Sequence, residues 1–91
     1  MATMRIPTPL RSYTGGNSEL QVSGNTVAEA LDQVTNQHPA LRQHLFTEDG
    51  QLRSFVNLFV NDEDVRFLQG VDTPVHEDDR LMILPSIAGG S

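Results

Sequence analysis

Hydrophobic and polar residues alternate along two segments near the start of the chain. Apolar side chains occupy positions 2, 4, 6 and 10, polar ones occupy positions 3 and 5, and a second alternation covers residues 19–23. A period of two residues is typical of a strand with one buried face. Pro7 and Pro9 suit the end of the first strand, and residues 13–17 are rich in turn formers. The pattern predicts a β-hairpin.

The next apolar residues recur at the helical positions i, i+3, i+4 and i+7. They are Val27, Ala30, Leu31 and Val34. Thr26 and Glu29 form a capping-box pair at the start of this run, and Pro39 disfavours helical geometry in the residue before it. We therefore predict a helix from about Thr26 to Gln37. A short further helical turn is expected around Leu41, Leu45 and Phe46.

The run from residue 55 to residue 61 is rich in strand-forming residues. Alternation places three of its apolar side chains on the face that can pack against the helix: Val56, Leu58 and Val60. Phe55 and Phe59 fall on the opposite face, and the chain offers no second helix to cover them. Two interpretations follow. The aromatic pair forms a docking surface for another protein, or loops and the neighbouring strand cover it.

The rest of the chain is expected to complete one sheet. Its elements, in order, are a turn at residues 61–64, a short strand at 65–67, loops at 73–74 and 77–80, and a last strand at 81–84. The resulting order, β-β-α-β-β-β, predicts an α+β fold in which one main helix packs across a mixed sheet of about five strands. We expect one domain over residues 1–85 and a flexible tail over residues 86–91.

Composition narrows the classes of function. The chain has 91 residues, no cysteine and a formal net charge of −6. Without cysteine it has no disulfide, zinc–thiolate site or cysteine nucleophile. An acidic chain without a basic stripe is a poor partner for nucleic acid, and no apolar run approaches the roughly 18 residues of a membrane span. We expect a soluble, cytoplasmic protein whose acidic surface docks on basic patches of partner proteins.

No residue pattern indicates a metal site or a catalytic site. The acidic runs at residues 62–64 and 77–79 are consecutive carboxylates beside turns, unlike the alternating ligands of a calcium loop. The three histidines fall in different expected elements without metal-ligand spacing: His38, His44 and His76. No serine lies in the context of a nucleophile elbow. We therefore expect no metal, no catalytic residue and no enzyme activity of the chain itself.

The end of the sequence is the remaining candidate for chemistry. It reads Ala88-Gly89-Gly90-Ser91 and follows Pro85, which fixes φ and stiffens the exit from the last strand. Two successive glycines give a narrow, flexible backbone that can thread into the active site of another protein. A terminal carboxylate is activated when it is joined to a good leaving group such as the phosphate of AMP, and a thiol or persulfide can then attack. The alternative is an inert, frayed end.

Four runs of the sequence carry a resemblance to a known family. They are Ile6-Pro7-Thr8-Pro9-Leu10-Arg11, Tyr13-Thr14-Gly15-Gly16, the thirteen residues from Phe55 to Phe67, and the eight residues from Ile83 to Gly90. The chain resembles the ubiquitin-like sulfur carriers of the MoaD/ThiS family, and within them the CysO type. The resemblance extends nearly from end to end. It implies a ubiquitin-like β-grasp fold and a role as a protein-borne sulfur donor.

The resemblance also implies partners. In such carriers a MoeB-type adenylating enzyme uses ATP and magnesium to activate the terminal glycine, here Gly90 after Gly89, and the adenylate is converted to a thiocarboxylate. For the CysO type, a PLP-dependent cysteine synthase holds the activated serine that accepts the sulfur, and a JAMM-type zinc metalloprotease frees the cysteine. The carrier itself binds no cofactor. The residues we assign to the partner-docking surface are Phe55, Phe59, Pro85, Ile87 and Ala88.

Ser91 departs from the family pattern. It follows Gly90, so the carboxyl group of Gly90 is held in a peptide bond and cannot be adenylated. We predict a processing site between Gly90 and Ser91, at which Ser91 is removed first; a cloned or variant end that blocks function is the alternative. Two other functions fit the same fold: the small subunit of molybdopterin synthase, and a modifier conjugated to lysines of other proteins. The chain has no lysine on which a modifier could build chains.

Overall fold

The computed structural model describes residues 2–54 and 56–85. In these residues one sheet contains five strands, β1 (Ala2–Arg5), β2 (Glu19–Val22), β3 (Val56–Val60), β4 (Glu63–Asp64) and β5 (Arg80–Pro85). The α-helices are α1 (Val27–Gln37) and α2 (Pro39–Leu45), and the 3₁₀ helices are η1 (Thr8–Thr14), η2 (Val65–Phe67) and η3 (Gly70–Asp72). The expected α+β class and the expected number of strands are confirmed.

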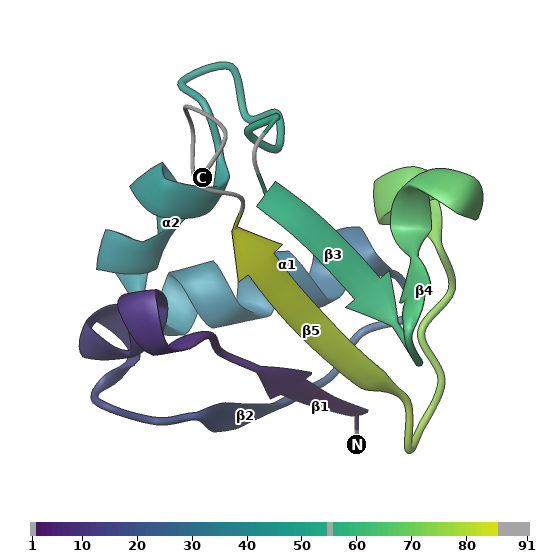
Figure 1. The fold of residues 1–91 in the computed structure, drawn as a ribbon, viewed down its shortest axis with the longest axis horizontal. Coiled ribbons are helices and arrows are strands. Elements are labelled where there is room, and N and C mark those ends of the chain that lie inside the picture. The colour runs from purple at the N-terminus through teal and green to yellow at the C-terminus, as the bar shows by residue number, and fades with distance from the viewer. Residues whose placement is uncertain (1, 55, 86–91) are drawn as a thin grey trace.

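The last strand occupies the middle of the sheet. The strand order is β2-β1-β5-β3-β4 (Figure 1). β1 and β2 form the expected antiparallel hairpin, whereas β5 pairs parallel with β1 and antiparallel with β3. The sheet is therefore mixed, and the strand that leads toward the C-terminal tail is held on both sides.

Helix α1 begins and ends where the sequence pattern indicates. The Thr26 hydroxyl accepts a hydrogen bond from the Glu29 N–H over 3.3 Å, and Glu29 Oε1 accepts one from the Asn25 N–H over 2.9 Å. The return bond of the capping box therefore reaches one residue further back than in the standard motif. The helix ends at Gln37 as expected. The further helical turn expected around Leu41, Leu45 and Phe46 is helix α2, which begins at Pro39 and ends at Leu45, so Phe46 lies just outside it.

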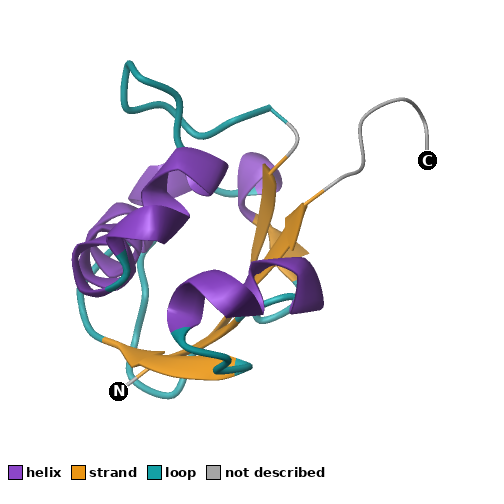
Figure 2. Ribbon diagram, turned by 90° about the vertical axis from the view of Figure 1, so that its left-hand side faces the viewer, coloured by secondary structure: helices purple, strands orange, loops and turns teal. Residues whose placement is uncertain are grey.

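The core lies between the α-helices and one face of the sheet. Figure 2 shows the two α-helices gathered on one side of the strands, and Figure 1 views the other face, which no α-helix covers. The largest fully buried apolar side chains come from both layers and from the segment after β1: Met4, Ile6, Val22, Val27, Leu31, Val34, Leu41, Leu45, Leu81 and Ile83. Within the described residues the α-helices cover only one face of the sheet, and alternate residues of β3 and β5 point away from the core.

Two segments differ from the expected elements. Residues 63–64 were expected in a turn but pair with β3 as strand β4, and residues 65–67 were expected as a strand but form η2. The reason is local: the Asp64 carboxylate accepts a hydrogen bond from the Arg66 N–H over 2.9 Å and so caps a 3₁₀ helix. The start of β5 at Arg80 also lies one residue earlier than predicted.

The first strand ends before Pro7, as the two prolines indicate, and the chain then turns into η1. The Leu10 N–H donates to the Pro7 carbonyl over 2.9 Å, which closes the first 3₁₀ turn. Leu10, the last position of the apolar alternation, lies in this helix and is buried. The 3₁₀ helix itself was not predicted from the sequence.

Candidate docking face

The described part of the chain stops at the end of β5, where the Gly-Gly tail would leave the sheet. In the antiparallel pair of β3 and β5, Pro85 lies opposite Val56. The other tail residues to which we assigned roles lie outside the described residues: Ile87, Ala88, Gly89, Gly90 and Ser91. So does Phe55, and of Pro85 only the backbone is described. The face of the sheet that leads to this end of β5 is described for the remaining residues of β3 and β5.

β3 separates its residues by face as the sequence predicts. Val56, Leu58 and Val60 are buried in the core. Phe59 is half-buried on the opposite face, where its neighbours across the strands are Met82 of β5 and Asp64 of β4. The structure thus combines the two interpretations of Phe59, because adjacent strands cover it partly and leave it accessible. Docking at Phe59 stays a prediction.

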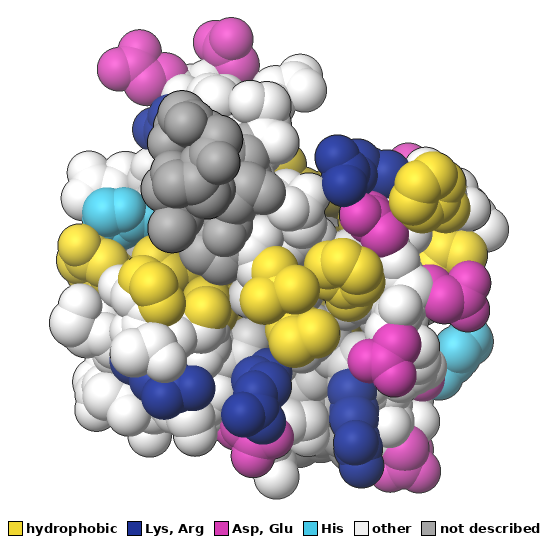
Figure 3. All heavy atoms as spheres, in the orientation of Figure 1, with side chains coloured by type: hydrophobic (Ala, Val, Ile, Leu, Met, Phe, Trp, Pro, Cys, Tyr) yellow, Lys and Arg dark blue, Asp and Glu magenta, His cyan; other side chains and the backbone are white. Residues whose placement is uncertain are grey.

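β5 adds two apolar side chains to the same face. Leu81 and Ile83 are buried, so Met82 and Leu84 alternate to the uncovered side, where Met82 is half-buried and Leu84 is 41 % exposed. We call Phe59, Met82 and Leu84 the apolar row. Figure 3 shows hydrophobic side chains gathered over β3 and β5 in the centre of this face. The sequence analysis missed Met82 and Leu84, although the alternation along the last strand would have identified them.

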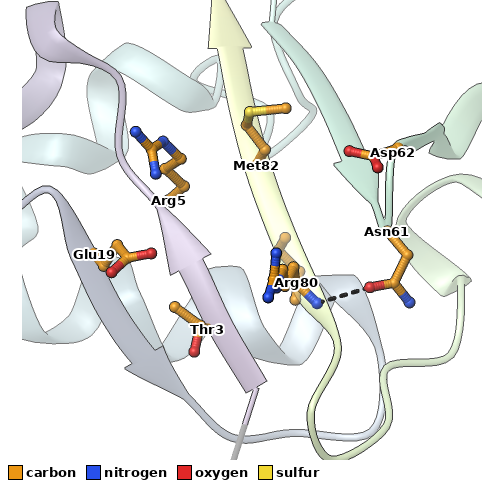
Figure 4. A pocket seen from close by; sticks show the side chains of 8 residues that line it. Thr3, Arg5, Glu19, Asn61, Asp62, Arg80 and Met82 are labelled. Atoms are coloured by element: carbon orange, nitrogen blue, oxygen red, sulfur yellow. Dashed lines mark hydrogen bonds between the residues drawn. The ribbon is translucent and has the colours of Figure 1, made fainter.

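The same face is charged at the other end of β5. A hollow of about 630 Å³ is lined there by Thr3, Arg5, Glu19, Asn61, Asp62, Arg80, Leu81 and Met82. Figure 4 shows Arg5 and Arg80 on adjacent strands, with Glu19 beyond Arg5 and Asp62 beyond Arg80. Along β5 the outward side chains therefore change from Arg80 through Met82 to Leu84, which is a change from charged to apolar toward the tail. None of these charged residues was predicted to belong to a docking surface.

Two carboxylates near this face have shifted pKa values. The Arg66 guanidinium, at 2.8 Å from Asp64, holds the pKa of that carboxyl below its usual value, mainly through the side-chain hydrogen bond. The pKa of Asp79 is lowered mainly by the hydrogen bond from the His76 N–H and then by one from the Asn61 amide. The first interaction caps η2 beside the edge strand β4, and the second fixes the turn that leads into the central strand β5. Within residues 2–54 and 56–85, no three His, Asp or Glu side chains converge as a metal site.

Strand order and helix placement define the class of protein. A mixed sheet with a parallel central pair of β1 and β5, and with α1 packed across it, is the ubiquitin-like β-grasp fold. In the described part of the chain no helix is long and apolar enough to cross a membrane. The solved structures agree on the fold. A chain of the Amycolatopsis orientalis BexX/CysO complex matches with a TM-score of 0.90 and 43% sequence identity, over 99% of this chain and 100% of that chain.

Further comparisons identify the family. The ThiS family model matches residues 4–90, and the sulfur carrier protein CysO of Mycobacterium tuberculosis is 39% identical over 90 residues, 97% of each chain. The small archaeal modifier protein 1 of Methanosarcina acetivorans matches in structure with a TM-score of 0.89 and 28% identity, over 98% of this chain and 95% of that one. The chain belongs to the ThiS family of sulfur carriers and is CysO-like. Proteins of this family are not catalytic. The chain is therefore a sulfur carrier and not an enzyme.

Proposed function

We propose that the chain donates sulfur from a thiocarboxylate at Gly90, for the synthesis of cysteine or a similar sulfur-containing metabolite. The observation that supports this most is the apolar row, which runs along β3 and β5 to the point where the tail leaves the sheet. A partner that binds this row therefore contacts the strand to which the tail is joined. Family membership and the similarity to CysO proteins point to the same use.

A partner enzyme of the MoeB type catalyses the adenylation of Gly90 and its conversion to a thiocarboxylate. The carboxylate of Gly90 attacks the α-phosphorus of magnesium-bound ATP, pyrophosphate leaves, and an acyl adenylate forms. Sulfide then attacks the acyl carbon and AMP leaves with one of the original carboxylate oxygens, so that the thiocarboxylate carries sulfur in place of that oxygen. Neither step needs a cofactor on the carrier. Gly89 contributes the narrow backbone that lets Gly90 reach the reacting phosphate.

The docking residues have distinct parts in this proposal. The apolar row of Phe59, Met82 and Leu84 contacts the adenylating enzyme, because it is the accessible apolar surface beside the exit. Phe55 and Pro85 extend that contact where β3 and β5 meet the exit, and Ile87 and Ala88 are bound as part of the tail. A PLP-dependent cysteine synthase would use the same face when it receives the sulfur, so the two enzymes would bind in turn.

Processing precedes activation in this proposal. Since Gly90 is joined to Ser91 by a peptide bond, its carboxyl group becomes free only when that bond is hydrolysed. A JAMM-type zinc metalloprotease suits this step, as well as the later release of the product from Gly90. The cleavage would leave Gly90 as the terminal residue.

Intact mass measurement tests the proposal. The full chain and a chain that ends at Gly90 are each incubated with the MoeB-type enzyme, ATP, magnesium and a sulfide source, with and without the protease. We expect the shorter chain to exchange one oxygen for sulfur without the protease, and the full chain to do so only after it loses Ser91. A shorter chain of unchanged mass contradicts the carrier function. Exchange in the full chain with Ser91 retained contradicts the processing step alone.

A second function is favoured by one observation. The similar structure from Methanosarcina acetivorans is of a small archaeal modifier protein, and its TM-score of 0.89 is close to that of the BexX/CysO match. As a modifier, the activated chain would form an amide with a lysine of another protein. Adducts in cell extract that resist thiols and map to lysines would support this function, whereas transfer of sulfur to a small acceptor would support the carrier.

A further inference from the structure

The six arginines of the chain differ in whether their side chains have partners. Four of them donate to a described group. Arg11 donates to the Ile6 carbonyl, Arg42 to Thr35, Arg53 to the Gln43 carbonyl and Arg66 to Asp64. Within the described residues the side chains of the other two, Arg5 and Arg80, make no hydrogen bond or ion pair. Both are exposed.

The two unpaired arginines lie together on the uncovered face of the sheet. In the parallel pair of β1 and β5, Arg80 lies opposite Thr3 and Arg5 lies opposite Met82, so the two arginines are diagonal neighbours. They line one hollow, with their side chains on the same side of the sheet (Figure 4). Arg5 is next to Met82, so the charged pair adjoins the apolar row directly. Figure 3 shows basic side chains, in dark blue, gathered below the central hydrophobic patch of this face.

The charges around Arg5 and Arg80 indicate which kind of group can bind between them. Two guanidinium groups with free donors bind carboxylates or phosphates, often in a bidentate geometry. Glu19 and Asp62 line the outer edges of the same hollow, and the chain carries a net charge of −6. Glu19 is the cross-strand neighbour of Arg5 in the β1–β2 pair. These acidic groups repel a polyanion such as nucleic acid, whereas an isolated carboxylate adds only one negative charge and can still bind the guanidinium groups. A protein surface with isolated acidic side chains fits this arrangement.

We propose that the enzymes that use this carrier present acidic side chains to Arg5 and Arg80, next to an apolar surface that covers Met82. The spacing along β5 fixes where those acids lie. Arg80 and Pro85 are five residues apart on one strand, which is about 16 Å at ~3.3 Å per residue. Arg5 lies opposite Met82, three residues or about 10 Å from Pro85. The acidic side chain that meets Arg80 therefore lies about 16 Å from the end of β5, and the one that meets Arg5 lies about 10 Å from it. The arginine pair sets the direction in which the carrier docks, which an apolar row alone does not.

This inference rests on the proposed function for its choice of partner. The probe is the MoeB-type enzyme, and association is measured by stopped flow at low and high salt. The variants are Arg5→Gln, Arg80→Gln and the double variant, and the matched control is Arg42→Gln, which removes the same charge from helix α2 in the other layer. Melting temperatures confirm that each variant is folded. The mass exchange of the chain that ends at Gly90 is followed in parallel.

We expect the double variant to associate about tenfold more slowly at low salt and to lose much of the salt dependence, because rim charges act mainly on the association rate. The control should stay within about twofold of the wild type. An Arg80→Glu chain should be rescued by an acid-to-arginine change in the enzyme about 16 Å from where the end of β5 binds. Unchanged association of the double variant, or equal loss in the control, overturns the inference.

The two readouts separate this inference from the proposed function. Mass exchange without any dependence on Arg5 or Arg80 leaves the carrier function in place and overturns the docking geometry. Arginine-dependent binding without mass exchange supports the docking geometry and contradicts thiocarboxylate formation. No binding to the enzyme at all overturns both. Binding of a single-stranded oligonucleotide that depends on the same two arginines would assign the hollow to nucleic acid and also overturn the inference.

Discussion

The side chain of Asn61 joins the turn after β3 to the start of β5 through Asp79. Asn61 Nδ2 donates to Asp79 Oδ1 over 2.8 Å, and Asn61 Oδ1 accepts from the Arg80 N–H over 3.0 Å. The backbone N–H of Asn61 donates to the Arg80 carbonyl over 2.8 Å. One residue thus fixes the position at which β5 begins, and with it the backbone that carries Arg80 and Met82 onto the docking face.

We expect Asn61→Ala to lower the free energy of unfolding by about 1–2 kcal/mol, because it removes two side-chain hydrogen bonds. Asn61 also has a φ of 51°, in the left-handed region that alanine adopts at a cost. Asn61→Gly is the matched control, since glycine keeps the backbone conformation and removes only the side chain. Urea unfolding should show a smaller loss for glycine than for alanine. Equal stability of all three chains would contradict a role for the Asn61 side chain.

Stability should fall in acid, in part through Asp79. Hydrogen bonds from His76 and Asn61 lower its pKa in the folded chain below the ordinary value of 3.8. The stabilisation is therefore complete above pH 3.8 and is lost as the pH falls through the lower pKa of the folded state. Asp64 contributes a loss of the same sign. Urea unfolding from pH 7 to pH 2 should give a shallower acid loss for Asp79→Asn than for the wild type; identical slopes would exclude Asp79 as a contributor.

Gly24 should tolerate no side chain. Its φ is +133°, and an added Cβ would lie 2.9 Å from the Glu29 Cβ and 3.2 Å from the Ala30 backbone nitrogen, both on the first turns of α1. Gly16, with a φ of +83° and no atom within 4 Å of an added Cβ, is the matched control for backbone strain alone. We expect Gly24→Ala to be less stable than Gly16→Ala by at least about 1 kcal/mol in thermal unfolding. A milder effect at Gly24 would mean that α1 shifts without cost.

Residues that repeat a local pattern could be placed from the sequence. The alternation of Val56, Leu58 and Val60 and the helical spacing from Val27 to Val34 follow from burial on one face, and the structure confirms both. Backbone conformation was less predictable where a side chain accepts a hydrogen bond from a backbone N–H that would otherwise pair with a neighbouring strand. Asp64 accepts from the Arg66 N–H and so turns an expected strand into a 3₁₀ helix.

The charged end of the docking face could not be predicted in the same way. Arg5 and Arg80 are nearly the whole chain apart, and only the register of the parallel pair β1 and β5 makes them neighbours. Net charge predicted an acidic surface that docks on basic patches, but net charge does not give the local charge of one face. By contrast, the position of Leu84 follows from alternation with the buried Ile83 and was available from the sequence.

Ile83 and Leu84 are adjacent residues with opposite exposures, and they separate stability from docking. Ile83 is 0% exposed and Leu84 is 41% exposed. We expect Ile83→Ala to lower the free energy of unfolding by about 2–5 kcal/mol, as for other large-to-small changes in a core. Leu84→Ala should cost less than about 1 kcal/mol and instead weaken binding to the adenylating enzyme. A large loss of stability at Leu84 with unchanged binding would place Leu84 in the core.

Phe59 should be the main contact of the apolar row. It is half-buried between Met82 and Asp64, and loss of its ring removes the largest side chain of the row. We expect Phe59→Ala to weaken binding to the MoeB-type enzyme by about tenfold or more, with a loss of stability well below that of Ile83→Ala. Phe67→Ala is the matched control, because Phe67 is 85% exposed on η2, outside the row. Calorimetric titration gives the affinities and urea unfolding gives the stabilities. Equal effects of the two variants on binding would show that the enzyme does not distinguish the apolar row from other exposed aromatic surface.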